Sequence, residues 1–396
     1  MLDFGISKQT FFDELHEKRP FIQRGGYAAL AVGWDEVDRA LFVGENTDAN
    51  LRVHKGGVID EAKYTELCSD LGVVRKRIIK AELAKLLEDG ASIIYNRMEG
   101  VSVPIRDLCN QVARFTGAPA AANGYISFGD KETFGNHWDT HDVFAVQLIG
   151  RKRWLVYEPT FSLPLPGQTS LHHKADCPAT PFFDEILEAG DILYIPRGWW
   201  HTAIPLREET FHVAIGVHPP VVANYVEWVA KNVLPDHFSC RHSIHANEQS
   251  RHIIAAAKET LLEVLFSDET FSAYQTQLVR NERTASAFDI ARPFRADAYD
   301  ELEQSRFILH SRFDGRAIFK ARTINGRASL RTPHGQAVTE SIANATQPIS
   351  FQALQAAHPA IKHEALLWTL NDLLLRDIIG KHARAPLTHA VAQAQP

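Results

Sequence analysis

Residues 137–154 read HWDTHDVFAVQLIGRKRW, with two histidines and two aspartates in the first six positions and an apolar run directly after them. Residues two apart on a strand point to the same side, so His137 and Asp139 can reach one metal ion. An imidazole and a carboxylate suit Fe(II), Mn(II) or Zn(II). The pair occurs by chance in many chains, so it indicates a metal site only together with a further ligand.

A second stretch, residues 190–201, reads GDILYIPRGWWH and supplies that ligand. It matches the second cupin motif, G-x5-P-x-G-x2-H, through Gly190, Pro196, Gly198 and His201. The pattern predicts a strand, a Pro-Gly turn and a histidine at the entry of the next strand. The asparagine that usually stands four residues after the histidine is absent, because Pro205 is there.

The first cupin motif, G-x5-H-x-H-x3,4-E-x6-G, normally provides three ligands. Aligned on His137, this chain has Asp139 for the second histidine, and Val143 stands at the glutamate position. The expected ligand set is therefore His137, Asp139 and His201. Two histidines and one carboxylate form the facial triad of non-heme Fe(II) oxygenases, which leaves coordination positions open for a cosubstrate and O2.

These two stretches together resemble the JmjC-type 2-oxoglutarate oxygenases, and most of all the ribosomal-oxygenase branch, whose members hydroxylate side chains of ribosomal proteins. The resemblance implies an α+β fold with a double-stranded β-helix core of the cupin or jelly-roll JmjC type and N-terminal helices. It implies a helical dimerisation region and a small winged-helix-like domain behind that core. Fe(II), 2-oxoglutarate and O2 are the implied cofactor and cosubstrates.

The resemblance also implies roles for residues around the metal. The basic residue that binds the distal carboxylate of 2-oxoglutarate lies thirteen positions after the metal aspartate, which here is Lys152. Members that hydroxylate a ribosomal protein can carry arginine there, so the lysine supports cosubstrate binding more than it supports the same substrate. Pocket-lining, cofactor-binding positions are also implied, namely Asn123, Tyr125, Ser127 and His212.

Some of these residues also have a purely structural interpretation. Lys152 lies in the basic turn GRKR, whose arginines are expected to be solvated, and Tyr125 also fits plain core packing. His141 is expected at the rim of the pocket rather than as a ligand. Asp142 is expected to cap a turn or orient a ligand.

Three functions remain open from the residues. The first is hydroxylation of a ribosomal-protein side chain, the second the same chemistry on a peptide natural product or free amino acid. The third is a non-catalytic metal-binding cupin, which would have no need of Lys152 inside an open site. Histone demethylation fits less well, because the chain has no zinc-binding cysteine modules among its 4 cysteines.

The composition limits which partners and which cellular compartment are expected for the protein. The net charge of −6 and the scattered cysteines fit a cytoplasmic protein, and the N-terminus lacks the apolar run of a signal peptide. No apolar stretch is long enough for a membrane span, so a membrane partner is not expected. Residues 316–331 are basic, but from 293 onward Lys and Arg exceed Asp and Glu by only 12 to 9, which favours a solvated face over nucleic acid.

Changes in periodicity divide the chain into expected domains. Residues 1–220 form the catalytic domain with its core at about 95–220, where short strands alternate with Gly, Pro and Asp turns. Residues 221–292 are expected to be helical and to form a homodimer. Residues 293–384 form the winged-helix-like domain, and 385–396 a tail. Before the core, residues 73–90 are predicted to be one charged helix, followed by a strand over 91–96 and a helix over 103–117.

Overall fold

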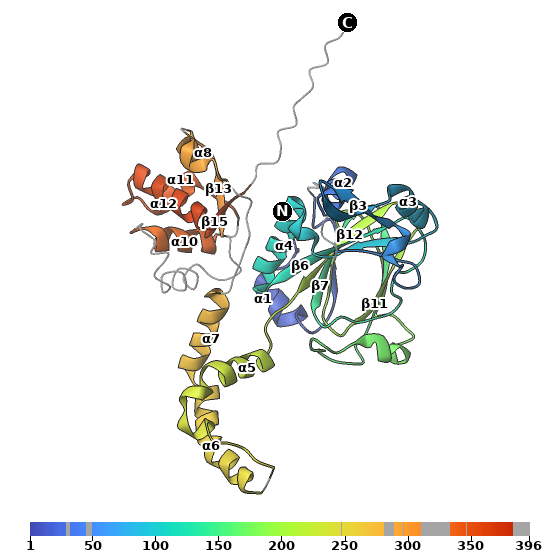
Figure 1. Cartoon of the computed structure of the whole chain (residues 1–396). Coiled ribbons are helices and arrows are strands. Elements are labelled where there is room, and N and C mark those ends of the chain that lie inside the picture. Colours follow the sequence, from blue (N-terminus) through green and yellow to red (C-terminus); the bar gives the residue numbers. More distant parts are fainter. Residues whose placement is uncertain are drawn as a thin grey trace. The chain divides into compact units, whose positions relative to one another are not determined.

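A computed structural model describes residues 1–28, 32–44, 50–246, 248–280, 289–295, 297–309, 333–345 and 347–382. The chain divides into two compact units, Met1–Pro219 and Pro220–Pro396 (Figure 1). Across these ranges, no helix has both the length and the apolar character that crossing a membrane would require.

A seven-stranded antiparallel sheet forms the larger wall of the first unit. Its order is β1-β10-β7-β12-β6-β5-β2. The strand bounds are β1 Phe21–Gln23, β10 Ile192–Ile195, β7 Asp142–Ile149, β12 Thr210–Val217, β6 Ala120–Ser127, β5 Ser92–Tyr95 and β2 Leu51–His54. Neighbours far apart in the sequence, such as β10 and β7, pair across long connections, which is typical of a jelly roll.

A second sheet, β11-β8-β9, faces the first. Its strands are β11 Trp200–Pro205, β8 Lys152–Tyr157 and β9 Phe183–Leu187. A buried cluster joins the two sheets, since it contains Val143 and Leu193 from the large sheet together with Trp154, Val156 and Leu187 from the small one. The predicted cupin-like core is confirmed.

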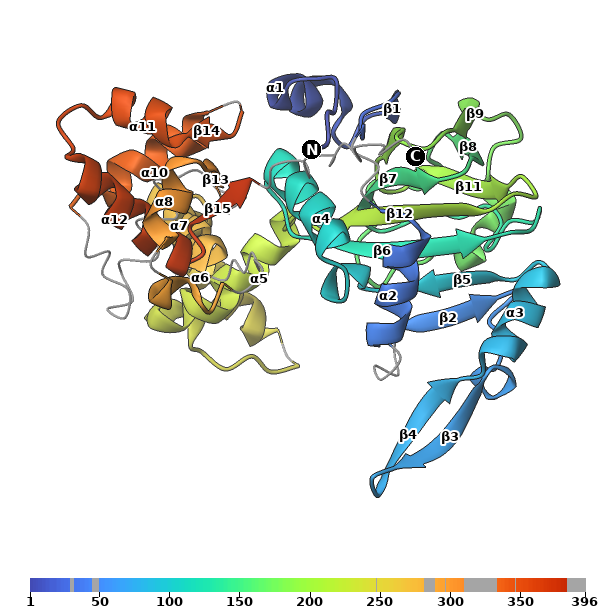
Figure 2. The same ribbon diagram turned by 90° about the horizontal axis from the view of Figure 1, so that it is seen from above.

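Helices cover the other face of the large sheet. Helix α4, Val103–Thr116, packs on β6 and β12, and Figure 2 shows it lying along these strands. Ser102 caps its first turn by accepting the N–H of Ile105, and Gly117 ends it at φ +70. The remaining helices of the unit are α1 Lys8–Thr10, continued by a π-helical turn Phe11–Leu15, α2 Trp34–Gly44 and α3 Lys80–Glu88.

The single helix predicted over 73–90 is wrong in its first part. Residues 73–78 are strand β4, which pairs with β3, Thr65–Asp70, in a hairpin that projects from the unit (Figure 2). Leu71 and Gly72 form the two-residue turn, both with positive φ, as a tight hairpin requires. The β-branched Val73, Val74 and Ile78 favour the extended state. The three consecutive basic residues at 75–77 are equally typical of a charged helix surface, which is why the sequence alone favours a helix there.

The second unit contains helices and a small sheet. Helices α5 Val222–Asn232, α6 Gln249–Leu265 and α7 Asp268–Arg280 come first. The sheet β14-β13-β15 and its helices follow, with bounds α8 Ala298–Glu303, β13 Arg306–Leu309, α10 Gly335–Asn344, β14 Ile349–Ser350, α11 Phe351–Ala357, α12 His363–Leu375 and β15 Ile379–His382. The basic stretch at 316–331 lies outside the described residues, as does the tail at 385–396. The winged-helix arrangement stays a prediction.

Candidate metal centre

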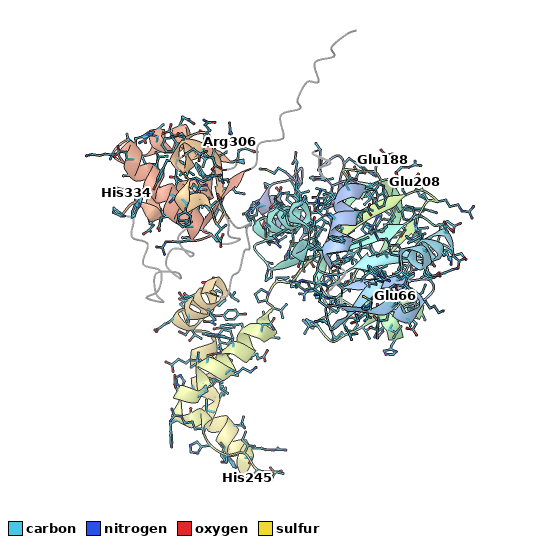
Figure 3. All side chains as sticks on the ribbon, turned by 45° about the horizontal axis from the view of Figure 1, so that its top comes forward. Glu66, Glu188, Glu208, His245, Arg306 and His334 are labelled. Atoms are coloured by element: carbon cyan, nitrogen blue, oxygen red, sulfur yellow. The ribbon has the colours of Figure 1, made fainter. Side chains whose placement is uncertain are left out.

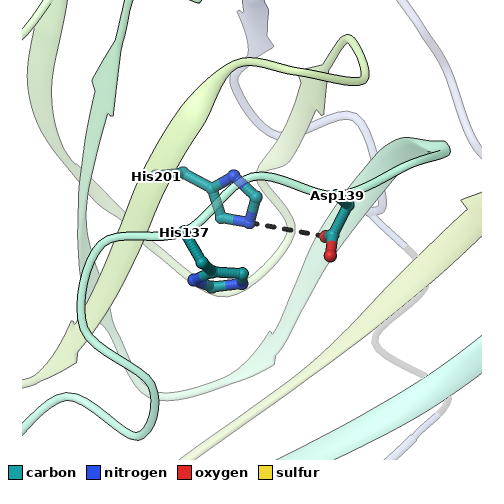
Figure 4. Close-up of side chains that lie close together, drawn as sticks. All are labelled: His137, Asp139 and His201. Carbon is teal, nitrogen blue, oxygen red and sulfur yellow. Dashed lines mark ion pairs between the residues drawn. The ribbon is translucent and has the colours of Figure 1, made fainter. Parts of the chain in front are cut away.

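Backbone pairing between the two motif stretches brings the three expected ligands together. The N–H of His137 donates to the carbonyl of His201 (3.1 Å), and the N–H of His201 donates back to His137 (2.8 Å). The N–H of Gly198 donates to the carbonyl of Asp139 (3.0 Å). As a result, one ligand atom from each of His137, Asp139 and His201 lies within 4.8 Å of the others. Figure 4 shows these side chains converging, with His201 Nε2 3.6 Å from Asp139 Oδ2.

Both imidazoles are held in the orientation that metal binding requires. Nδ1 of His137 lies 3.0 Å from the carbonyl of Gly135, and Nδ1 of His201 lies 3.0 Å from the carbonyl of Trp199. A carbonyl only accepts, so each Nδ1 must carry the proton and each Nε2 keeps a free lone pair. This arrangement is the usual support for a metal-bound histidine. The donor set therefore fits a divalent cation.

The charges of the cluster suit coordination at neutral pH. Burial raises the pKa of Asp139, but the positive charge that the surrounding histidines carry when protonated outweighs burial and lowers the pKa of this carboxyl; these are His137, His201, His141 and His218. Burial, with His137 close by, lowers the pKa of His201 to about 4. A carboxylate and a neutral imidazole are the states that bind a metal.

Lys152 is a buried cation in the same cavity. It opens β8, is 1% exposed, and lines the cavity together with the three ligand residues. Its Nζ lies 3.5 Å from Nδ1 of His212, and no carboxylate in the described ranges forms an ion pair with it. Burial lowers the pKa of Lys152 to about 7. A buried ammonium group without an anion is costly, so the cavity fits an anionic ligand that reaches this end.

Aromatic side chains form the wall beside Lys152. The Tyr125 ring stacks on His212 at 4.8 Å, and the Trp154 ring meets His212 edge-on at 5.3 Å. The indole N–H of Trp154 is buried without a hydrogen-bond partner. Trp154 was not among the predicted site residues, although its position two residues after Lys152 on the same strand was a usable signal.

Two predicted pocket residues are not brought into the lining. The Ser127 hydroxyl pairs with the hydroxyl of Ser92 on β5 (2.7 Å), and Asn123 Oδ1 accepts the N–H of Arg97 (3.1 Å). The lining of the cavity includes Tyr125 but neither of these two residues. Asn123, Tyr125 and Ser127 alternate along β6 and so lie on one face of the strand, but only the middle residue of the three lines the cavity. His141 lies against His218, with ring centroids 4.6 Å apart, and is not one of the three clustered ligands.

A two-sheet β-helix with two histidines and a carboxylate converging between the sheets defines a metal-binding protein of the cupin class. Residues 101–225 match the family model of the JmjC domain, so this part of the chain is a JmjC domain and the expected resemblance is confirmed.

The chain is similar to curated proteins named bifunctional lysine-specific demethylase and histidyl-hydroxylase NO66. The protein of Drosophila yakuba is 34% identical over 218 residues, covering 54% of this chain and 31% of that protein. That of Drosophila mojavensis is 26% identical over 238 residues, covering 58% and 26%. The match therefore spans under a third of the length of either relative.

The fold is similar to that of the ribosomal oxygenase YcfD from Escherichia coli. One structure of that protein superposes with a TM-score of 0.54 at 18% identity, covering 96% of this chain and 99% of that one. A structure of YcfD with cobalt and 2-oxoglutarate gives a TM-score of 0.55 at 18% identity, covering 97% and 100%. At this identity the likeness establishes the fold alone.

Proposed function

We propose that the protein is an Fe(II)- and 2-oxoglutarate-dependent oxygenase that hydroxylates an amino-acid side chain, and that the acceptor belongs to a ribosomal protein. The observation that carries the proposal is the pairing of two features in one cavity. The three convergent ligand atoms suit a divalent metal, and the buried Lys152 without a carboxylate suits a dicarboxylate bound beside it. The names of the relatives, histidyl-hydroxylase and ribosomal oxygenase, agree with this chemistry.

The residues of the chain have separate tasks in this scheme. His137, Asp139 and His201 would hold Fe(II), which together with 2-oxoglutarate and O2 supplies the oxidising power that C–H hydroxylation needs. Lys152 binds the distal carboxylate of 2-oxoglutarate by a charge-assisted hydrogen bond. Three side chains line that end of the cavity and exclude water from it, namely Tyr125, His212 and Trp154.

The remaining proposals concern assembly and surroundings. We propose a cytoplasmic homodimer formed through residues 221–292, a winged-helix-like domain over 293–384, and no nucleic-acid partner. Several large apolar side chains of the helices are exposed, among them Val226, Leu262, Phe266 and Phe271. Exposed apolar side chains on helices favour a partner surface.

The test is succinate formation from 2-oxoglutarate by purified protein with Fe(II), ascorbate and extracted host ribosomal proteins, with mass spectrometry of the products. A gain of one oxygen atom on a single ribosomal protein is expected, and His137→Ala should abolish it. His172→Ala is the control, because this exposed histidine lies outside the cluster. Succinate without a modified ribosomal protein would redirect the search to peptides or free amino acids. No succinate under any condition would favour the non-catalytic binding protein.

A further inference from the structure

The buried carboxylate of Asp142 lies at the start of β7, directly behind the metal-binding stretch. Asp142 is 2% exposed. Its Oδ2 accepts the hydroxyl of Tyr194 on β10 (2.8 Å), and its Oδ1 accepts the N–H of Arg197 (3.0 Å). Nε2 of His16 lies 3.6 Å from Oδ2. The carboxylate thus joins three separate parts of the chain.

Two of those parts carry the metal ligands. Arg197 lies in the turn Pro196–Gly198 that precedes His201, while Asp142 follows Asp139 closely in the sequence. The backbone bonds between Gly198 and Asp139 and between His137 and His201 lie in the same seam. Next to these backbone hydrogen bonds, the Asp142 carboxylate accepts the N–H of Arg197 and so connects the Pro196–Gly198 turn to the 137–142 stretch.

The third part is the N-terminal segment. The Arg197 guanidinium, itself 8% exposed, donates to Glu17 Oε1 (2.6 Å), and the N–H of Glu17 donates to the Tyr194 hydroxyl (3.3 Å). Glu17 adopts φ +58, a left-handed conformation that costs free energy for any residue except glycine. The contacts to Arg197 and Tyr194 hold it there. Residues 16 and 17 thereby close the network around Asp142 from outside the two cupin motifs.

We infer that Asp142 is a positioning residue for the metal centre, whose carboxylate fixes the Pro196–Gly198 turn so that His201 stands opposite His137 and Asp139. The network made by Tyr194, Arg197 and Glu17 holds that carboxylate in place. This inference rests on the metal-binding part of the proposed function. It adds the N-terminal segment to the machinery of the site, although no metal-binding motif extends that far.

A purely structural role is the competing explanation, and the chain contains a matched control. Asp191 is also buried, at 4% exposed, and it too accepts backbone N–H groups, from Gly25 and Glu188, and a side-chain donor, Arg24. It too ties the N-terminal segment to the β-helix. Asp191 lies at the start of the second motif, but its carboxylate contacts Arg24, Gly25 and Glu188 and reaches neither the Pro196–Gly198 turn nor residues 137–139. A general loss of stability should therefore follow from both substitutions, but a loss of metal affinity from only one.

The test is titration of the full-length apoprotein with Co²⁺ in the absence of oxygen, followed by absorption, alongside thermal unfolding of the same samples. Asp142→Asn replaces one carboxylate oxygen by an N–H donor, so the hydrogen of either the Arg197 N–H or the Tyr194 hydroxyl loses its acceptor. We expect its Kd for Co²⁺ to rise about 10-fold, the lower end of the range for residues that support metal ligands. Asp191→Asn should lower the Tm and leave the Kd for Co²⁺ unchanged.

Tyr194→Phe provides a second variant in case Asp142→Asn does not fold, because it removes one donor and keeps the carboxylate. A weaker Co²⁺ affinity in this variant supports the inference. Unchanged affinity in both variants, or equal loss in Asp191→Asn, overturns it and leaves Asp142 a stabilising residue only. Failure of the wild-type protein to bind Co²⁺ would instead overturn the metal site itself, and the inference with it.

Discussion

At the residue scale, both histidines of the cluster use the same local device. Each ring donates from Nδ1 to the carbonyl two residues earlier in the chain, Gly135 for His137 and Trp199 for His201. The tautomer is therefore set by local backbone geometry before any metal arrives. Lys152 differs, because only the folded barrel buries it and lowers its pKa.

The first prediction concerns cosubstrate affinity. Removing one partner of a buried charge pair costs about 2–5 kcal/mol. Lys152→Met should therefore weaken 2-oxoglutarate binding to the Co²⁺-loaded protein by that amount in isothermal titration. Lys152→Arg should restore much of the affinity, because it keeps the cation. Equal affinities for wild type and Lys152→Met would place the distal carboxylate elsewhere.

The second prediction uses the pKa of Lys152, which burial lowers to about 7 from 10.5. Between these pH values the unfolded chain holds more protons at this residue than the folded chain, so its contribution to stability rises with pH. Its burial destabilises the ligand-free protein most at pH 7 and below. Lys152→Met should therefore unfold at higher urea than wild type near pH 7, and this difference should shrink as the pH approaches 10.5. A difference independent of pH would contradict the assignment.

At the element scale, the corner between β7 and β8 decides which residues of β8 face the cavity. Gly150 turns this corner at φ +63, and a Cβ there would lie 1.9 Å from the carbonyl oxygen of Glu209. The next residue, Arg151, forms an ion pair with Glu208, which lies at the surface of the unit (Figure 3). Lys152 then begins β8 and points inward. The collision at Gly150 and the left-handed backbone both require glycine.

Gly150→Ala should therefore lower the free energy of unfolding by more than an alanine that only has to adopt a left-handed backbone conformation. Gly167→Ala is the control, because Gly167 also has positive φ (+93) but has no atom within 4 Å of the added Cβ. We expect Gly150→Ala to lose about 1–3 kcal/mol more than Gly167→Ala, since overpacking adds to the backbone strain. Urea unfolding of both variants measures this. Equal losses of unfolding free energy in the two variants would show that the backbone at Gly150 shifts to accommodate the added Cβ at no energetic cost.

At the scale of the whole molecule, the second unit leaves apolar surface on its first helices. Phe266, at the end of α6, is 81% exposed and Leu262 is 45% exposed. The two residues are four positions apart, so they are neighbours at the same side of the helix end, and both lie in the region proposed to dimerise.

The prediction is a dimer by light scattering that the double substitution Leu262→Glu and Phe266→Glu converts to a monomer. Leu71→Glu is the control, because this side chain is 99% exposed on the β3–β4 hairpin of the first unit. It should leave the mass unchanged. A monomeric wild-type protein would contradict the proposal, and a dimer that survives the double substitution would move the interface elsewhere.

The sequence by itself determined the three residues that converge, because the spacing of the two cupin motifs and the Pro-Gly turn are local properties of the chain. The resemblance that these motifs carry implied the cupin-like core. It did not determine β4, because the basic run Arg75–Arg77 is equally typical of a helix surface, and only pairing with β3 through the two-residue turn selects the extended state. It also did not determine that Ser127 pairs with Ser92, or that Trp154 joins the cavity. Those facts depend on which strands become neighbours and which side chains face each other between the sheets. The network around Asp142 depends most on the tertiary structure. This network joins the N-terminal segment to two motif loops, and only the folded barrel brings these three parts together.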